Sequence, residues 1–178
     1  NSFQLGQTFC PIISFTTVPN LNIKTGDKVQ VDLVFTSFVK ATLATGYIDE
    51  YSYDSMNYAV SYTAYGKMIQ LDKDYNSALT YPATFSAMVD EICSQNGLTF
   101  DTFDWKCNAK LKAKPVFGNL DNGDPAYASA REMLGIIAGV NGCNVVIGTD
   151  EKVKFVPYTD TKTSITYEDA FSRQVNNE

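Results

Sequence analysis

Alternating apolar and polar positions in the first part of the chain predict β-structure. The run 29–35 places an apolar residue at every second position after a turn signal at 24–27, so we expect a strand with one buried face. An earlier strand is predicted at 12–17. Strands at 45–53 and 58–65, separated by a short polar loop, complete a small antiparallel sheet or barrel.

The period of the pattern changes after Tyr65. Large and small residues alternate up to that position, whereas Met68, Ile69 and Leu71 cluster at the spacing of a short helical turn. We expect this turn to close the β-rich part of the chain.

The first long helix is predicted beyond Tyr81-Pro82. Its apolar positions recur at helical spacing, and Asn96-Gly97 is a good C-terminal signal. A helix of about a dozen residues is expected. The apolar positions are Phe85, Met88, Val89, Ile92 and Cys93.

Two short extended pieces are predicted next, at 98–105 and 110–116. A second helix should then begin at Asp124-Pro125, because Asp suits the N-cap and Pro the first helical position. It should run to about Asn141. Its apolar stripe is formed by Ala130, Leu134, Ile137 and Ala138, with Met133 and Ile136 beside it.

A later start for this helix is the alternative, since Ser129 and Glu132 have the spacing of a capping box. After the helix, strands at 143–147 and 152–156 should form a hairpin across 148–151. The elements together predict the α+β class. We expect a β-barrel-like domain at 1–77, an α+β domain with two main helices and a hairpin at 78–162, and a connection at 163–178.

Length, charge and hydropathy exclude several classes of protein. A chain of 178 residues can bury a real core, and no apolar run approaches the ~20 residues that cross a bilayer. A net charge of −6 disfavours nucleic-acid binding, which depends on clustered Lys and Arg. The chain does not begin with Met, and we interpret it as a fragment of a longer protein.

The four Cys residues argue against a zinc site, because they are far apart in sequence and the chain has no His. Two disulfides are possible by number, but Cys93 and Cys143 fall in apolar helix and strand patterns. We expect free thiols, and we expect no metal or cofactor.

No arrangement typical of catalysis is found. The absence of His removes the commonest general base, and neither a nucleophile elbow, a dinucleotide fingerprint nor a P-loop occurs. Neighbouring carboxylates remain, but solvated surface is the better interpretation. We therefore nominate no catalytic, cofactor-binding or metal-binding residue and expect no enzyme. The pairs are Asp49 with Glu50, Asp72 with Asp74, Asp90 with Glu91, Asp101 with Asp104, and Glu168 with Asp169.

Two further patterns, an acidic segment and a group of tyrosines, have simpler structural explanations. Asp72 to Ser77 opens like an EF-hand loop, but Ser77 and Ala83 stand where that loop needs Gly and Glu, so a polar turn is the better interpretation. A wealth of tyrosines allows a sugar-binding site, although aromatic pairing across a sheet explains them better. These residues are Tyr47, Tyr51, Tyr53, Tyr58, Tyr62 and Tyr65.

Several segments follow one another in an order that matches a known family. They are 63–68, 71–73, 81–84, 88–93 with Gly97, 131–143 and 152–155. In this order they resemble the tail-hub proteins of phages that infect Gram-positive bacteria. The resemblance covers about 45–171, and its motifs are packing and turn signals rather than catalytic ones. The chain departs from the family pattern at Gly66, where Asp is frequent, and at Glu151, where a hairpin Gly is common.

This resemblance implies a structural component of a phage or prophage tail tip or baseplate hub. Such hubs have two related β-barrels with an α+β domain between them, and this chain resembles the first barrel and the middle domain, with a second barrel missing. The implied full-length protein is a homotrimer of the virion tail, made in the bacterial cytoplasm. It would continue the tail tube, contact a distal tail protein, and carry fibre, receptor-binding or wall-degrading modules.

Two other functions stay open. A carbohydrate-binding module would need an exposed aromatic platform, and a hydrolase fragment would need two acids that converge in a cleft.

Overall fold

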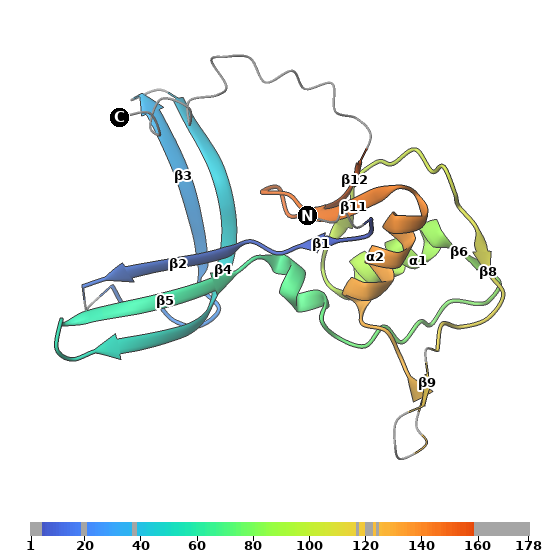
Figure 1. Cartoon of the computed structure of the whole chain (residues 1–178), viewed down its shortest axis with the longest axis horizontal. Helices are drawn as coiled ribbons and strands as arrows, with labels where there is room; N and C mark the ends of the chain where they lie inside the picture. The colour runs from blue at the N-terminus through green and yellow to red at the C-terminus, as the bar shows by residue number, and fades with distance from the viewer. Residues whose placement is uncertain are drawn as a thin grey trace.

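The computed structural model describes residues 5–18, 21–36, 39–116, 118, 119, 123 and 125–158, and it has two parts. A curled antiparallel sheet projects from an α+β body that carries both helices (Figure 1). The α+β class predicted from the sequence is confirmed. We call these two parts the curled sheet and the body.

The curled sheet contains four strands in the order β2-β5-β4-β3. They are β2 (Ile12–Thr17), β3 (Lys28–Thr36), β4 (Val39–Asp54) and β5 (Ala59–Tyr65). All four predicted strands are present, although β4 begins earlier than predicted. Register shifts at Val31/Asp32 and Ile48/Glu50 interrupt the pairing, and such bulges bend and twist a sheet.

One face of this sheet holds a small core of Ile13, Ile48, Tyr62 and Ala64. The prediction that the 29–35 strand buries one face is wrong in part, because Val29 and Val31 are only half-buried and Leu33 is 42% exposed. Among the described residues the four strands curl without closing, so the apolar side of β3 is only partly covered.

The change of period at Tyr65 marks the passage from sheet to body. The predicted turn is confirmed as the 3-10 helix η1 (Lys67–Leu71). Met68 and Leu71 are fully buried in the core of the body, while Ile69 is exposed. The turn therefore anchors the end of β5 to the neighbouring core.

The body is built on a mixed sheet in the order β1-β11-β12-β7. Its strands are β1 (Thr8–Phe9), β11 (Cys143–Ile147), β12 (Lys152–Pro157) and β7 (Thr99–Phe100). The predicted β11–β12 hairpin is confirmed. Since β1 pairs in parallel with β11, β1 belongs to the body, and the chain then leaves the body to form the curled sheet and returns through η1.

Helices α1 (Phe85–Gln95) and α2 (Ala130–Val140) share one core with β11 and β12. The predicted stripe of α2 is buried, and so is Met133, whereas Ile136 is exposed. Among the described residues, none belongs to both this core and the core of the curled sheet. The extended pieces are shorter than predicted: β7 and β8 (Lys110–Leu111) have two residues each, and β8 pairs with β6 (Ala83–Thr84).

The start of α2 corrects the prediction of a cap at Asp124-Pro125. Pro125 lies in β10 (Pro125–Ala126), which pairs with β9 (Gly118–Asn119). The helix instead starts after Ser129, whose side chain and that of Glu132 form a complete capping box. Backbone hydrogen bonds from Tyr75 to Ala128 and from Ala130 to Lys73 hold the preceding residues extended, so the later cap prevails.

The described part of the chain contains no helix that is long and apolar enough to cross a membrane. Cys10, Cys93, Cys107 and Cys143 are free thiols, and burial raises the pKa of Cys93 to about 12.

Candidate functional site

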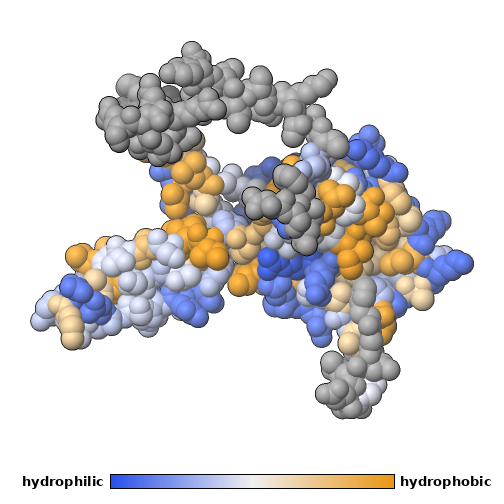
Figure 2. Space-filling model, viewed as in Figure 1, coloured by the Kyte–Doolittle hydropathy of each residue, from blue (hydrophilic) through white to orange (hydrophobic). Residues whose placement is uncertain are grey.

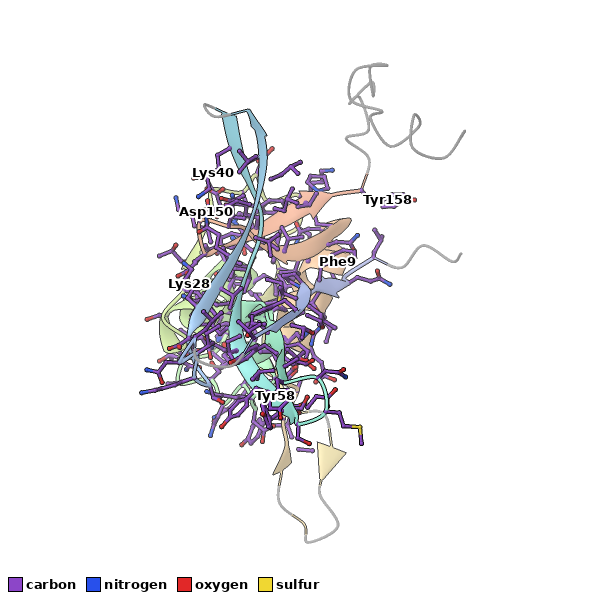
Figure 3. All side chains as sticks on the ribbon, turned by 90° about the vertical axis from the view of Figure 1, so that its left-hand side faces the viewer. Phe9, Lys28, Lys40, Tyr58, Asp150 and Tyr158 are labelled. Atoms are coloured by element: carbon purple, nitrogen blue, oxygen red, sulfur yellow. The ribbon has the colours of Figure 1, made fainter. Side chains whose placement is uncertain are left out.

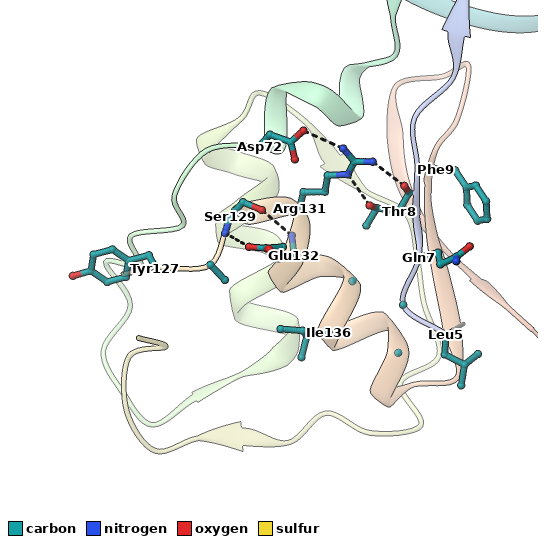
Figure 4. A pocket seen from close by; sticks show the side chains of 14 residues that line it. Leu5, Gln7, Thr8, Phe9, Asp72, Tyr127, Ser129, Arg131, Glu132 and Ile136 are labelled. Atoms are coloured by element: carbon teal, nitrogen blue, oxygen red, sulfur yellow. Dashed lines mark hydrogen bonds and ion pairs between the residues drawn. The ribbon is translucent and has the colours of Figure 1, made fainter. Parts of the chain in front are cut away.

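A groove of about 1060 Å³ lies between the N-terminal segment and helix α2 (Figure 4). Leu5 and Phe9 contribute from the N-terminal segment, and Arg131 and Ile136 contribute from α2. The groove is thus formed by two segments that are more than a hundred residues apart in sequence, brought together by the β1–β11 pairing.

Close backbone packing positions the N-terminal segment on α2. The amide of Gly6 donates to the carbonyl of Cys143 at 2.9 Å, with a positive φ of 76° at Gly6. Gly135 and Gly139 face this segment, and a Cβ atom at Gly135 would lie 2.5 Å from the Gly6 carbonyl oxygen. Only glycine at position 135 allows this approach.

Arg131 links three segments at the edge of the groove. Its Nε donates to Thr8 Oγ1 at 2.7 Å, its Nη2 donates to the Thr8 carbonyl at 3.1 Å, and its Nη1 pairs with Asp72 at 3.0 Å. A guanidinium is planar and holds its N–H donors in a rigid geometry, so it can bind several acceptors at once. Arg131 therefore fastens β1 and the segment after η1 to helix α2.

Glu132, the other acidic residue at the groove, caps the start of helix α2. The Ser129 amide donates to Glu132 Oε2 at 2.8 Å, and the Glu132 amide donates to Ser129 Oγ at 3.1 Å. Because Asp72 is paired with Arg131, the charged groups of the groove are joined to each other or to the backbone. This arrangement provides no pair of carboxylates set up for acid–base chemistry.

Exposed apolar side chains border the same groove. Leu5, Phe9 and Ile136 are 53%, 50% and 45% exposed, and Val140 on the next turn of α2 is 53% exposed. Figure 2 shows hydrophobic surface over this part of the body. The groove is chemically suited to apolar contact.

Of the carboxylate pairs considered in the sequence, the four that the structure describes do not converge on a cleft. Asp49, Glu50, Asp90 and Asp104 are exposed, as solvated surface predicts. Asp72 pairs with Arg131. Glu168 and Asp169 lie outside the described residues. No three His, Cys, Asp or Glu side chains come together as a metal site within the described ranges.

Glu91 corrects the interpretation of its pair as solvated surface. It is half-buried and accepts hydrogen bonds from the Tyr75 hydroxyl, from Ser77 Oγ at 2.7 Å and from the Ala78 amide at 2.8 Å. Burial and this hydrogen bond raise the pKa of Tyr75. The polar turn that begins at Asp72 is thereby fixed to helix α1, with Tyr75 fully buried beneath it.

Aromatic residues on the curled sheet extend from its core to an exposed end. The rings of Phe15 and Tyr62 stack at 5.2 Å, and Tyr51 lies 6.1 Å from Tyr62 across the β4–β5 pair. Tyr51 and Tyr53 are 61% and 56% exposed on this face. Tyr58 belongs to the β4–β5 turn, with a positive φ of 50°, and not to a strand as predicted.

Glu151 connects the body to the curled sheet. Its Oε1 accepts hydrogen bonds from Lys28 Nζ and the Tyr47 hydroxyl, both at 2.7 Å, and its Oε2 pairs with Lys67 Nζ at 2.5 Å. These donors lower the pKa of Glu151 to about 2. The sequence did not predict this role; it showed only that Glu151 occupies a position where the tail-hub family commonly has Gly.

The described residues form an α+β fold that exposes apolar side chains beside α2 and on the curled sheet. No protein-family model matches the chain, and no curated protein matches it. Among solved structures the chain is similar to the 43 kDa tail protein of prophage MuSo2 from Shewanella oneidensis, with a TM-score of 0.55 and 14% sequence identity. The match covers 90% of this chain and 51% of that chain.

The chain therefore spans about half the length of the prophage protein. At this identity the likeness concerns the fold, and it extends across both the curled sheet and the body. The fold of this chain is thus similar to that of about half of a prophage tail protein.

Proposed function

We propose that this chain is part of a structural component of a phage or prophage tail. The observation that carries the proposal is the likeness to a prophage tail protein over 90% of the chain. The described surfaces support a role in assembly, because exposed apolar residues are found both beside α2 and on the curled sheet. Such residues gather where proteins contact partners.

The curled sheet adds a second reason to expect assembly. Within the described residues, β2 and β3 each pair with one neighbour only, so both edges of the sheet are open. Open edges and an uncovered apolar face are features that proteins normally cover or pair. A multi-subunit tube or tail tip would provide that cover.

The finer proposal is a tail-tip or baseplate hub of a phage that infects Gram-positive bacteria. In this proposal residues 1–77 form the first barrel-like domain, 78–162 the middle domain, and 163–178 the connection to a second barrel. β1 and η1, which belong to the first range, pack with the core of the second. The full-length protein would be a non-enzymatic homotrimer that contacts a distal tail protein and carries fibre, receptor-binding or wall-degrading modules.

Electron microscopy of labelled particles tests the proposal. Particles would be prepared from a strain that carries the full reading frame, and antibodies raised against this chain would be detected with gold. We expect gold at the distal end of the tails. Gold along the whole tube would leave a tail role but reject the hub, and unlabelled particles would reject both. The oligomeric state of the full-length protein, measured by light scattering, tests the trimer separately.

A carbohydrate-binding module is the second candidate, and the exposure of Tyr51 and Tyr53 favours it. Aromatic faces of this kind can stack on sugar rings. Co-sedimentation with purified bacterial cell wall, using Tyr51→Ala with Tyr53→Ala, tests the idea. Tyr58→Ala is the control, because this tyrosine lies in the turn and is still more exposed, at 70%. Binding that is lost only in the double variant would support the module, and absence of binding by the unmodified chain would reject it.

A further inference from the structure

The curled sheet and the body are joined where two chain connections run side by side. The amide of Gly66 donates to the Pro11 carbonyl at 2.9 Å, and Cys10 Sγ lies 3.5 Å from the Gly66 carbonyl oxygen. A Cβ atom at Gly66 would lie 2.6 Å from Pro11 Cδ. Both connections therefore pass together through one narrow point, the Pro11–Gly66 crossing.

A second link, separate from this crossing, is made by Glu151. The carboxylate holds Lys28 from β3 and Tyr47 from β4, and it also holds Lys67 at the start of η1. The Lys67 ammonium lies 5.8 Å from the centre of the Tyr47 ring. Figure 3 shows Asp150, the residue before Glu151, on the same side of the molecule as Lys28.

The backbone at Glu151 is strained for a residue that has a side chain. Its φ is 61° in the hairpin turn, where its amide donates to the Gly148 carbonyl at 2.9 Å. Glycine adopts such a conformation freely, whereas other L-residues do so at a cost. The turn itself thus favours Gly, and the contacts of the Glu151 side chain lie outside the hairpin. A strained residue with such contacts points to a function for its side chain.

The two cores are separate, so neither one fixes the angle between sheet and body. In the described part of the chain, no residue of the curled-sheet core also belongs to the body core. A rotation of the sheet about the Pro11–Gly66 crossing would leave both cores intact. The contacts of Glu151 with Lys28 and Tyr47, by contrast, would separate, whereas Lys67 lies on the body side of the crossing.

We propose that Glu151 is an ionic latch that sets the angle between the curled sheet and the body, with the Pro11–Gly66 crossing as the hinge. The groups that face the latch are Lys28 and Lys67, both cationic, and the neutral Tyr47 hydroxyl. Breaking the latch frees the sheet to reorient as a unit. This inference does not depend on the proposed role in a phage tail.

Residual dipolar couplings of backbone amides in the full chain test the latch. In the unmodified protein, we expect amides of β2–β5 and amides of α1, α2 and β11 to fit one common alignment tensor. In Glu151→Gly, which removes the side chain and relieves the turn, the two groups should require different tensors. Asp150→Asn is the matched control, because this neighbouring carboxylate pairs with Lys154 inside the same hairpin. It should retain the common tensor.

Each outcome decides the proposal. A common tensor with unchanged orientation in Glu151→Gly would overturn it, and so would two tensors in the unmodified protein. Unfolding of Glu151→Gly would also overturn it, because a latch orients two cores without making either. Lys28→Met, which removes one arm from the sheet side, should give an intermediate loss of common alignment and thus support the ionic contacts as the cause.

Discussion

The carbonyl oxygen of Gly6 lies so close to Gly135 that a Cβ atom at Gly135 would stand 2.5 Å away from it. The Gly6 backbone is held by the hydrogen bond from its amide to the Cys143 carbonyl, so its own carbonyl cannot move aside as a flexible side chain can. This contact positions the N-terminal segment and hence one wall of the groove.

Gly135→Ala should therefore destabilise the protein. Overpacking destabilises a protein by about 1–3 kcal/mol, whereas the higher helix propensity of Ala stabilises a helix by roughly 1 kcal/mol relative to Gly. We therefore expect the free energy of unfolding to fall by about 1 kcal/mol. Amide exchange at Gly6 and Val145 should also accelerate, because their hydrogen bonds join the N-terminal segment to β11. Urea unfolding and hydrogen exchange by NMR measure these changes.

Gly139→Ala is the control for this substitution. Its Cβ atom would meet Gly6 Cα at 3.4 Å, an ordinary contact distance. Stability should be unchanged or higher by up to about 1 kcal/mol. Equal behaviour of the two alanine variants would contradict the role assigned to Gly135.

Tyr75→Phe should weaken the attachment of the 72–78 segment to helix α1. The buried hydroxyl donates to the Glu91 carboxylate, and a hydrogen bond to a charged group contributes about 1.5–3 kcal/mol. We expect a loss in that range by urea unfolding. Asp90→Asn, on the exposed side of the same helix, should change stability by less than about 0.5 kcal/mol. An unchanged free energy of unfolding in Tyr75→Phe would show that the hydrogen bond from Tyr75 to Glu91 does not contribute to stability.

The stabilisation due to Glu151 should depend on pH in the acid range. Its pKa is lowered from 4.5 to about 2 in the folded protein. A lowered folded-state pKa means stabilisation that is complete above the unfolded value and lost as pH falls toward the folded value. The stability difference between the unmodified chain and Glu151→Gln should thus be constant well above pH 4.5 and be lost progressively as the pH falls through about 2.

Urea unfolding between neutral pH and pH 2 measures this difference. The pKa of Asp32 is also lowered to about 2, chiefly by its hydrogen bond with Lys40. Asp32 is present in both proteins, so its contribution cancels when the two curves are subtracted. A difference that does not vary with pH would contradict the ionised contacts of Glu151.

Ser129→Ala should destabilise helix α2 from its start. Loss of an N-cap serine costs about 0.5–2 kcal/mol, which corresponds to a fall of roughly 2–4 °C in Tm per kcal/mol for a chain of this size. Thermal unfolding followed by circular dichroism measures the effect. Ser94→Ala, an exposed position near the end of α1, should leave Tm nearly unchanged. If both variants behave alike, the capping box contributes little.

Local patterns in the sequence predicted the main elements well. The end of α1 at Asn96-Gly97 is a local signal, and Gly97 has the positive φ of 63° that glycine permits. The start of α2 was harder, since Asp124-Pro125 and Ser129 with Glu132 are both plausible caps. Backbone hydrogen bonds with the distant 73–75 segment decide between them, and no local pattern reveals those bonds.

The polar residues that matter most at the groove and at the junction were not predicted. Arg131 reaches Thr8, which is 123 positions away, and Glu151 reaches Lys28, also 123 positions away. Their roles follow from tertiary contacts that leave no pattern in the surrounding sequence. Glu151 alone offered a hint, because a charged residue occupied a hairpin position that suits Gly.

The crossing of Pro11 and Gly66 makes the curled sheet an insertion in topological terms. Residues 12–65 leave and re-enter the body at adjacent points, 2.9 Å apart between the Gly66 amide and the Pro11 carbonyl. The body is therefore complete without them in terms of its own sheet and helices. Protein engineering could therefore replace residues 12–65 with another domain whose N- and C-terminal ends lie close together. The new domain would be inserted between β1 and η1, and no strand or helix of the body would be cut.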